Sequence, residues 1–372
     1  MQISQRLLSL DAFRGFTIAG MILVNDPGTW AHVYPPMRHA SWDGCTPTDL
    51  VFPFFVFIMG VSMYFSLSKY NHQLSSATAR KILKRTALIF LVGLLLTWFP
   101  FYHKAVSDYR IMNVLQRIAL AYGAAAFIGI LMPSRALWYV IGGILLFYWW
   151  AMWAFGGGPD PFSLETNFAR ALDLKILGES HLYGGYGIPF DPEGLFHSIP
   201  TVGTALIGFQ IGRLIKLTEN RSELVKKLLI YGLIGIGLGL LWDMVFPINK
   251  PLWSSSYVLY TAGLGSCLLG LFMEFYDLQK RTFAKTFLVV FGTNAIFAYV
   301  LHGLLFKISY SVFRWDTASG GRQHPFGWVY QNVFAEVLGN NAFASLVYAM
   351  TYVFLCWGIT YLLYRRKIFL KV

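Results

Sequence analysis

Long apolar runs alternate with shorter polar connections along the whole chain. A membrane-spanning helix needs roughly 20 mainly apolar residues, and about ten runs approach that length. They lie near residues 9–25, 48–67, 86–102, 112–132, 136–155, 195–212, 228–246, 254–277, 286–306 and 343–363. No connection between them is long enough to bury a core of its own. The pattern therefore predicts an all-α protein, a polytopic membrane helix bundle of about ten transmembrane helices that forms a single domain over residues 1–372.

Lysine and arginine gather in the connections on one side of this predicted bundle. With an even number of spans, both termini lie on that same side. The basic stretches read "KYNHQLSSATARKILKR", "GRLIKLTENRSELVKK", "DLQKRTFAK" and "RRKIFLKV". Positively charged connections stay in the cytoplasm, so the pattern predicts an integral membrane protein with both termini cytoplasmic, in the inner membrane if the cell is bacterial. The long connections 26–47, 156–194 and 307–342 then face outward, to the periplasm in a bacterial cell.

Composition supports the membrane interpretation and excludes other classes. The 372 residues are 56% hydrophobic and only 13% charged, with a mean hydropathy of +0.52. The net charge of +12 follows from the basic connections, and no basic stripe is interleaved with stacking aromatics, so we expect no nucleic-acid partner. Cys45, Cys267 and Cys356 are too widely spaced for a disulfide framework or a metal site. The first run carries Asp11 and Arg14 and no cleavage site follows it, so we expect a retained first span.

Ionisable groups inside the spans need partners, because burying them in lipid is costly. Asp11 and Arg14 are three residues apart and can pair on one helix face. Arg117 has no acidic neighbour on its own helix, so it requires a partner from another segment or an anionic ligand. Asn294 and His302 are eight residues apart on one predicted helix, and a hydrogen-bonded contact between helices is the favoured role for Asn294.

Polar residues also cluster where the predicted outer connections meet the spans. The candidates are Asn25, Asp26, His39, Trp42, Asp43, Asp49, Asp191, Glu193, Asn249, Lys250 and Trp253. A histidine at such a position can act as a general base or as a transient nucleophile. A carboxylate can fix its tautomer, and an amide can donate to a developing oxyanion. Aromatic residues at this depth also fit an interfacial belt.

Seven sequence blocks in order resemble the heparan-α-glucosaminide N-acetyltransferase family and its bacterial relatives. The blocks are "RLLSLDAFRGFTIAGMILVN", "HASWDG…DLVFPFFVFIMG", "YRIMNVLQRIALAY", "FDPEGLFHSIPTVGTALIGFQIGRL", "INKPLWSSSYVL", "GTNAIFAYVLHG" and "YRRKIFLKV". The resemblance runs from near residue 6 to the C-terminus. It implies transfer of the acetyl group of cytoplasmic acetyl-CoA to an amino sugar on the other side of the membrane, with no metal.

The resemblance also implies site residues. The histidine of the H-x-S-W-[DN]-G block falls on His39, and its companion asparagine falls on Asn25. By position, Asp49 and Asp43 are candidates to orient His39. The candidates for the sugar are Lys250, Asn249, Trp253, Asp191 and Glu193, and those for CoA are Arg14, Arg117 and Arg110. The chain begins almost at its first span, so we expect no large luminal N-terminal domain of the animal kind, which leaves the acceptor sugar open.

Two other interpretations stay open from the sequence. A sugar permease also uses a bundle of about ten helices with polar groups inside the spans. An inactive relative kept for assembly with partners is the third, since a fold alone does not secure a function. The spans are rich in glycine and aromatic residues, and this composition is compatible with a homodimer in the lipid membrane.

Overall fold

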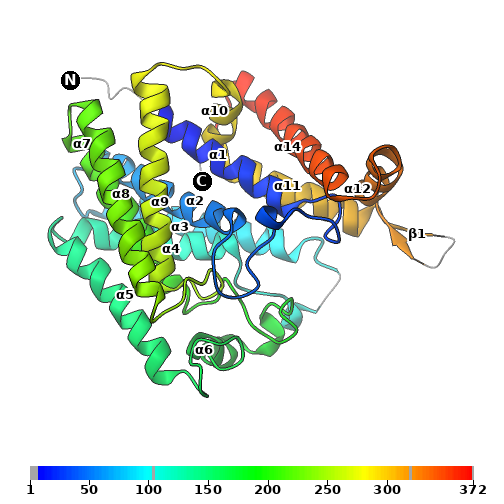
Figure 1. Cartoon of the computed structure of the whole chain (residues 1–372), viewed down its shortest axis with the longest axis horizontal. Coiled ribbons are helices and arrows are strands. Elements are labelled where there is room, and N and C mark those ends of the chain that lie inside the picture. The colour runs from blue at the N-terminus through cyan, green and yellow to red at the C-terminus, as the bar shows by residue number, and fades with distance from the viewer. Residues whose placement is uncertain (1–6, 103–104, 318–320, 371–372) are drawn as a thin grey trace.

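The computed structural model describes residues 7–102, 105–317 and 321–370, and nearly all of its regular structure is helical (Figure 1). The long helices are α1 (Leu8–Asn25), α2 (Pro47–Leu67), α3 (Ser76–Trp98), α4 (Val114–Leu131), α5 (Ala136–Phe155), α7 (Ser198–Leu217), α8 (Arg221–Asp243), α9 (Ser255–Phe272), α11 (Ala295–Lys307) and α14 (Ala342–Arg365). The shorter ones are α6 (Phe168–Leu177), α10 (Lys285–Thr293), α12 (Pro325–Val329) and α13 (Glu336–Leu338). Strands β1 (Trp315–Asp316) and β2 (Arg322–Gln323) form a small antiparallel hairpin. The all-α membrane bundle predicted from the sequence is confirmed.

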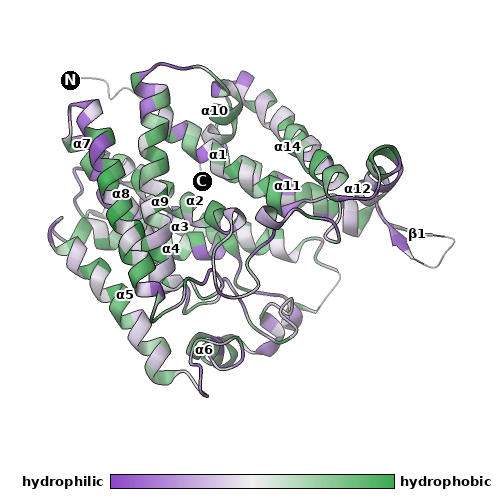
Figure 2. Ribbon diagram, in the orientation of Figure 1, coloured by the Kyte–Doolittle hydropathy of each residue, from purple (hydrophilic) through white to green (hydrophobic). Residues whose placement is uncertain are grey.

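Eight helical segments in the described part of the chain are long and apolar enough to cross a membrane. The other two predicted runs, 86–102 and 195–212, correspond to α3 and α7. Lys81, Lys84 and Arg85 make the first half of α3 polar. Helix α7 is buried along most of its length by its neighbours, so it does not need a lipid-facing apolar surface. Figure 2 shows hydrophobic residues along the long helices and hydrophilic ones mainly in the connections and at helix ends.

The prediction of a single helix over residues 286–306 is wrong, because the helix is interrupted at Asn294, between α10 and α11. The Asn294 side chain donates to the carbonyl of Ile368 (3.1 Å) and accepts from the Leu370 N–H (2.9 Å). The hydrogen-bonded contact expected for Asn294 is therefore present, but its partner is the C-terminal segment of the chain instead of another helix. His302, on α11, lies 2.9 Å from the buried carboxylate of Asp26.

Helices α2 and α7 cross at very close range through glycines. A Cβ atom at Gly60 would collide with the carbonyl oxygen of Ala205, and one at Gly208 would collide with that of Phe57. Small residues allow such close approach of backbones inside a membrane bundle. The crossing fixes α2, which carries Asp49 in its first turn, against α7, which begins directly after His197.

Three connections pack together beside the starts of α2, α7 and α9: residues 26–46, 156–197 and 244–254. The third is unusually buried for a connection, since Phe246, Asn249, Leu252 and Trp253 are all inaccessible. The Gly44 N–H donates to the carbonyl of Ile248 over 2.7 Å, which joins the first connection to the third. The packed connections form one side of a site at this end of the bundle.

Candidate active site

A pocket of about 290 Å³ lies among these connections. It is lined by His39, Ala40, Asp49, Arg110, Arg117, Tyr183, Gly185, Tyr186, Pro192, Glu193, Lys250, Pro251 and Trp253. Most of the residues predicted from the sequence thus come together, from positions more than 200 residues apart in the chain. The structure gathers them because α2, α4 and α9 all begin at this end of the bundle.

His39 and Asp49 form a close polar pair in the pocket. The Nδ1 atom of His39 lies 2.6 Å from Oδ1 of Asp49. Asp49 is the third residue of α2, where its other oxygen accepts from the Thr46 N–H and the Ala40 N–H, each at 3.0 Å. This capping arrangement keeps the carboxylate ionised and fixed. It therefore favours the imidazole tautomer with its proton on Nδ1 and its lone pair on Nε2.

The two members of this pair differ in exposure. The Asp49 side chain is 1% exposed, whereas the His39 side chain is 44% exposed. The carboxylate is thus shielded while the imidazole is reachable from the pocket mouth. Of the two carboxylates predicted to orient His39, Asp49 contacts it, whereas the exposed Asp43 accepts from Asn249 Nδ2 over 3.1 Å.

Lys250 places a cation beside the imidazole. Its Nζ atom lies 3.0 Å from Nδ1 of His39, 3.4 Å from Nε2 and 3.4 Å from Oδ1 of Asp49. Burial lowers the pKa of Lys250, although the carboxylates of Asp49 and Glu193 oppose the shift. An ammonium at this place can stabilise negative charge that develops near Nε2.

Arg110 holds two carboxylates on one wall of the pocket. It donates to both oxygens of Asp191 over 2.7 and 2.6 Å and to Glu193 over 2.5 Å, and it lies over the ring of Tyr183. Burial acts to lower the pKa of Arg110, but these partners outweigh it and raise the pKa. Burial likewise acts to raise the pKa of Glu193, and Arg110, Arg117 and Lys250 lower it. Arg110, predicted to bind CoA, thus forms ion pairs with Asp191 and Glu193, which were predicted to bind the sugar.

Arg117 is almost completely buried behind the pocket. Its Nη2 atom donates to the carbonyl of Pro192 over 2.6 Å, and its guanidinium lies 5.0 Å from the ring centre of Trp253. Its Nε atom has no hydrogen-bond partner among the residues that the structure describes. The partners of Arg117 from other segments are thus the carbonyl of Pro192 and the ring of Trp253. Arg117 also lines the same cavity as His39.

The remaining predicted residues lie outside this pocket. Arg14 contacts Asp11 (3.4 Å), the carbonyl of Gly292 and Ser62, so the predicted pair with Asp11 is present. Ser62 follows Asp49 along α2 by about 20 Å, so Arg14 belongs to the other part of the bundle. Asn25 is exposed at the end of α1. Asn249 is buried and accepts from the Leu252 N–H over 2.7 Å, which stabilises the third connection.

Sequence reasoning did not select two tyrosines that line the pocket. Tyr183 lies over Arg110, and Tyr186 packs edge-on against Trp42. Both belong to the stretch "LYGGYG", whose aromatic residues between glycines were an available signal for a ligand-facing loop. Aromatic faces of this kind add to the apolar surface that ligand pockets offer beside their polar groups.

Asp173, on α6, is a buried carboxyl directly behind this wall. It is 1% exposed, its Oδ1 accepts from the Leu195 N–H over 3.1 Å, and its Oδ2 has no partner among the described residues. Burial raises the pKa of Asp173 to about 7. The folded protein therefore holds a proton here that the unfolded chain releases near its ordinary pKa of 3.8.

Asp173→Asn is expected to stabilise the protein increasingly as the pH rises. Between pH 4 and 7 the native fold binds more protons at this site than the unfolded chain, so ionisation of the unfolded chain progressively lowers stability, and above pH 7 the deficit is constant. The amide removes that deficit and can still accept from Leu195. Thermal unfolding of both proteins from pH 5 to 8 measures the difference in Tm. Asp316→Asn, on the exposed β1, is the control, and a difference that stays flat with pH contradicts the prediction.

Fold and site together define a polytopic helical membrane protein with a histidine–carboxylate pair at the mouth of a charged pocket. Residues 6–238, more than half of the chain, match the family described as heparan-alpha-glucosaminide N-acetyltransferase, catalytic. The chain therefore belongs to this family of membrane N-acetyltransferases, as its sequence blocks predicted.

Two curated relatives extend the similarity along the whole chain. The heparan-alpha-glucosaminide N-acetyltransferase of Homo sapiens is 27% identical over 99% of this chain and 60% of its own length. The Mus musculus protein of the same name is 27% identical over 99% of this chain and 61% of its own length. The chain thus spans about three fifths of the length of these relatives.

Proposed function

We propose that this protein is a transmembrane acetyltransferase that moves the acetyl group of cytoplasmic acetyl-CoA to the amino group of an amino sugar on the periplasmic side. The observation that carries the proposal is the 2.6 Å contact between His39 and Asp49 in a pocket open to solvent. Membership of an N-acetyltransferase family supports the reaction class. The basic connections at the opposite end of the bundle support the sidedness.

The chemistry requires a base, because a sugar amine attacks a thioester only when its nitrogen lone pair is free. In the direct route, the nitrogen bonds to the acetyl carbon, Nε2 of His39 takes the proton from that nitrogen, and the carbon–sulfur bond breaks to release the CoA thiolate. The proton then returns from His39 to the thiolate. Asp49 holds the imidazole and stabilises its cationic form during the exchange.

An alternative route uses the same residues in two steps. Nε2 of His39 first attacks the thioester and forms an acetyl-imidazole as the CoA thiolate leaves. The sugar amine then bonds to the acetyl carbon, the bond from that carbon to Nε2 breaks, and the amine proton passes to the imidazole and from there to the thiolate. In both routes negative charge develops on the acetyl oxygen. Lys250, 3.4 Å from Nε2, is suited to stabilise that charge. Asn25 stays a predicted donor for the same oxygen.

The size of the pocket fits part of the substrates. At about 290 Å³ it lies near the lower limit of ligand sites, roughly 300–1,000 Å³, so it accommodates a sugar ring with the acetyl group and leaves most of CoA outside. Arg117 supplies a cation beside this space. Arg14, toward the basic end, stays a predicted contact for CoA phosphates, which bind cations and bidentate donors.

Incubation of the purified protein with radiolabelled acetyl-CoA and a panel of amino sugars tests the proposal. We expect labelled N-acetyl sugar from at least one free amine, and no product from N-acetylglucosamine, whose nitrogen is already blocked. Absence of product from every amine, together with uptake of labelled amino sugar into sealed vesicles without acetyl-CoA, would overturn the proposal in favour of the permease.

A further inference from the structure

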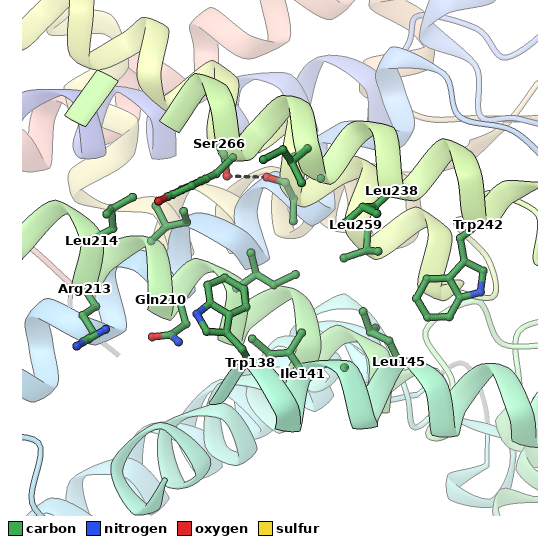
Figure 3. A pocket seen from close by; sticks show the side chains of 18 of the residues that line it. Trp138, Ile141, Leu145, Gln210, Arg213, Leu214, Leu238, Trp242, Leu259 and Ser266 are labelled. Atoms are coloured by element: carbon green, nitrogen blue, oxygen red, sulfur yellow. Dashed lines mark hydrogen bonds between the residues drawn. The ribbon is translucent and has the colours of Figure 1, made fainter. Parts of the chain in front are cut away.

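Another large cavity lies away from the candidate active site. It has a volume of about 630 Å³ and is bounded by α5, α7, α8 and α9, on a side of the bundle where α5 and α8 expose many large apolar residues. We call it the α5–α8 pocket. Its lining is almost entirely apolar, and Figure 3 shows these side chains between Arg213 and Leu214 at one end and Trp242 at the other.

Polar groups occur mainly at one end of the α5–α8 pocket. Figure 3 shows Gln210 and Arg213 together at that end, beside Trp138 and Leu214. Gln210 is 5% exposed, donates through Nε2 to the carbonyl of Ser134 over 2.7 Å, and leaves Oε1 without a partner among the described residues. Half-buried Arg213 makes no hydrogen bond or ion pair within the described part of the chain. An amide and a cation are thus available to a ligand at one end.

More positive charge surrounds this end. Arg135 directly follows Ser134, whose carbonyl accepts from Gln210, and Lys216 lies on the last turn of α7, one turn beyond Arg213. Both Arg135 and Lys216 are exposed, and Glu219 is the acidic residue that follows on the same connection. The three basic side chains and the single carboxylate of Glu219 together favour an anionic group at this end of the α5–α8 pocket.

The pocket is long enough to span the depth of one leaflet of a bilayer. Its lining extends along α7 from Ile207 to Leu217 and along α8 from Tyr231 to Trp242, which is about 15 Å on each helix. The hydrocarbon core of a bilayer is about 30 Å thick, so a single leaflet contributes about half of that. A chain that enters beside Arg213 reaches the middle of the bundle near Ile207 and Tyr231, and further apolar space continues toward Trp242, the penultimate residue of α8.

We propose that the α5–α8 pocket is a binding site for an anionic phospholipid, with one acyl chain among its apolar residues and the phosphate beside Arg213 and Gln210. The guanidinium of Arg213 and the second Nε2–H of Gln210 donate to the phosphate, and the free Oε1 of Gln210 accepts from a hydroxyl of the headgroup. Arg135 and Lys216 add attraction for the negative charge. The lipid comes from the leaflet on the side of the basic connections. This site is separate from the His39 pocket, and the proposal does not depend on the reaction.

Two neighbouring glycines of α5 provide a matched test. A Cβ atom at either Gly142 or Gly143 meets nothing within 4 Å, so both positions tolerate a large side chain. Gly142 lines the pocket and Gly143 does not. Gly142→Phe is therefore expected to fill the cavity, while Gly143→Phe adds the same ring to the same helix outside it. Arg213→Gln removes the headgroup cation, and Lys84→Gln, exposed on α3, removes a basic charge elsewhere.

The measurement is native mass spectrometry of the purified protein in detergent, titrated with phosphatidylglycerol or with phosphatidylcholine of the same acyl chains. We expect one phosphatidylglycerol bound at least tenfold more tightly than phosphatidylcholine by the native protein, Gly143→Phe and Lys84→Gln. Gly142→Phe should weaken binding of both lipids at least tenfold, and Arg213→Gln should abolish the preference between them.

Three results would overturn the proposal. Equal affinity of the native protein for the two lipids would identify ordinary, unselective lipid contact. Equal binding by Gly142→Phe and Gly143→Phe would place the lipid elsewhere. A native dimer that becomes monomeric in Gly142→Phe without loss of lipid would assign the pocket to a second copy of the chain. If Gly142→Phe fails to fold, the pair Arg213→Gln and Lys84→Gln decides through the lipid preference alone.

Discussion

Replacing His39 by alanine is expected to lower acetyl transfer by about three orders of magnitude while the protein stays folded. General acid–base catalysis typically contributes about 10²–10⁴-fold, and in either proposed route His39 is the group that takes the proton or the acetyl. The side chain is 44% exposed and forms no part of the apolar core, so its loss should cost little stability. The measurement is the initial rate with labelled acetyl-CoA and a saturating amino sugar.

Two controls separate catalysis from structure. His32→Ala removes an exposed histidine from the same connection and should leave the rate unchanged. Asp49→Asn keeps an oxygen that can accept from Nδ1 but removes the charge that stabilises the cationic imidazole, so its rate should fall between native and His39→Ala. A rate for His39→Ala above one tenth of native, at an unchanged Tm, would contradict the assignment.

Arg110→Met is expected to destabilise the fold strongly. The change leaves Asp191, which is fully buried, and Glu193 without their shared cation. Removing one partner of a buried ion pair costs about 3–5 kcal/mol, because the remaining charge is left without compensation. The measurement is thermal or denaturant unfolding in detergent, in which we expect a large fall in Tm or a loss of folded protein.

The surrounding charges supply tests of that explanation. Combining Arg110→Met with Asp191→Asn and Glu193→Gln removes the unpaired charges and should recover part of the stability. Arg322→Gln breaks an exposed pair with Asp316, at 3.8 Å, which contributes at most about 1 kcal/mol and should leave Tm nearly unchanged. Equal destabilisation by Arg110→Met and Arg322→Gln would show that Arg110 acts as a surface charge.

Much of the fold follows from the sequence because lipid imposes a simple rule on membrane helices. Their length and apolar composition are set by bilayer thickness, so the runs along the chain predicted nearly every long helix. The interruption at Asn294 could not be predicted in this way, because the hydrogen bonds that compensate it come from Ile368 and Leu370, far away in the sequence. Helix α7 was found by its apolar run, although it is enclosed by protein more than by lipid.

The site was partly predictable for similar reasons. His39 and Asp49 are ten residues apart at the start of a span, and their proximity follows from local chain geometry and the cap of α2. The pairing of Arg110 with Asp191, and that of Asp26 with His302, joins residues that only tertiary packing brings together. Sequence patterns identified these polar residues as unusual inside the membrane protein, but gave no means of choosing their partners.

The most direct test of the central claim uses sealed proteoliposomes that contain an amino sugar, with labelled acetyl-CoA added only outside. If acetyl crosses the membrane through the His39 pocket, labelled N-acetyl sugar accumulates inside the vesicles with the native protein and does not with His39→Ala. Product that forms only when both substrates share one compartment, or forms equally with His39→Ala, would contradict the account.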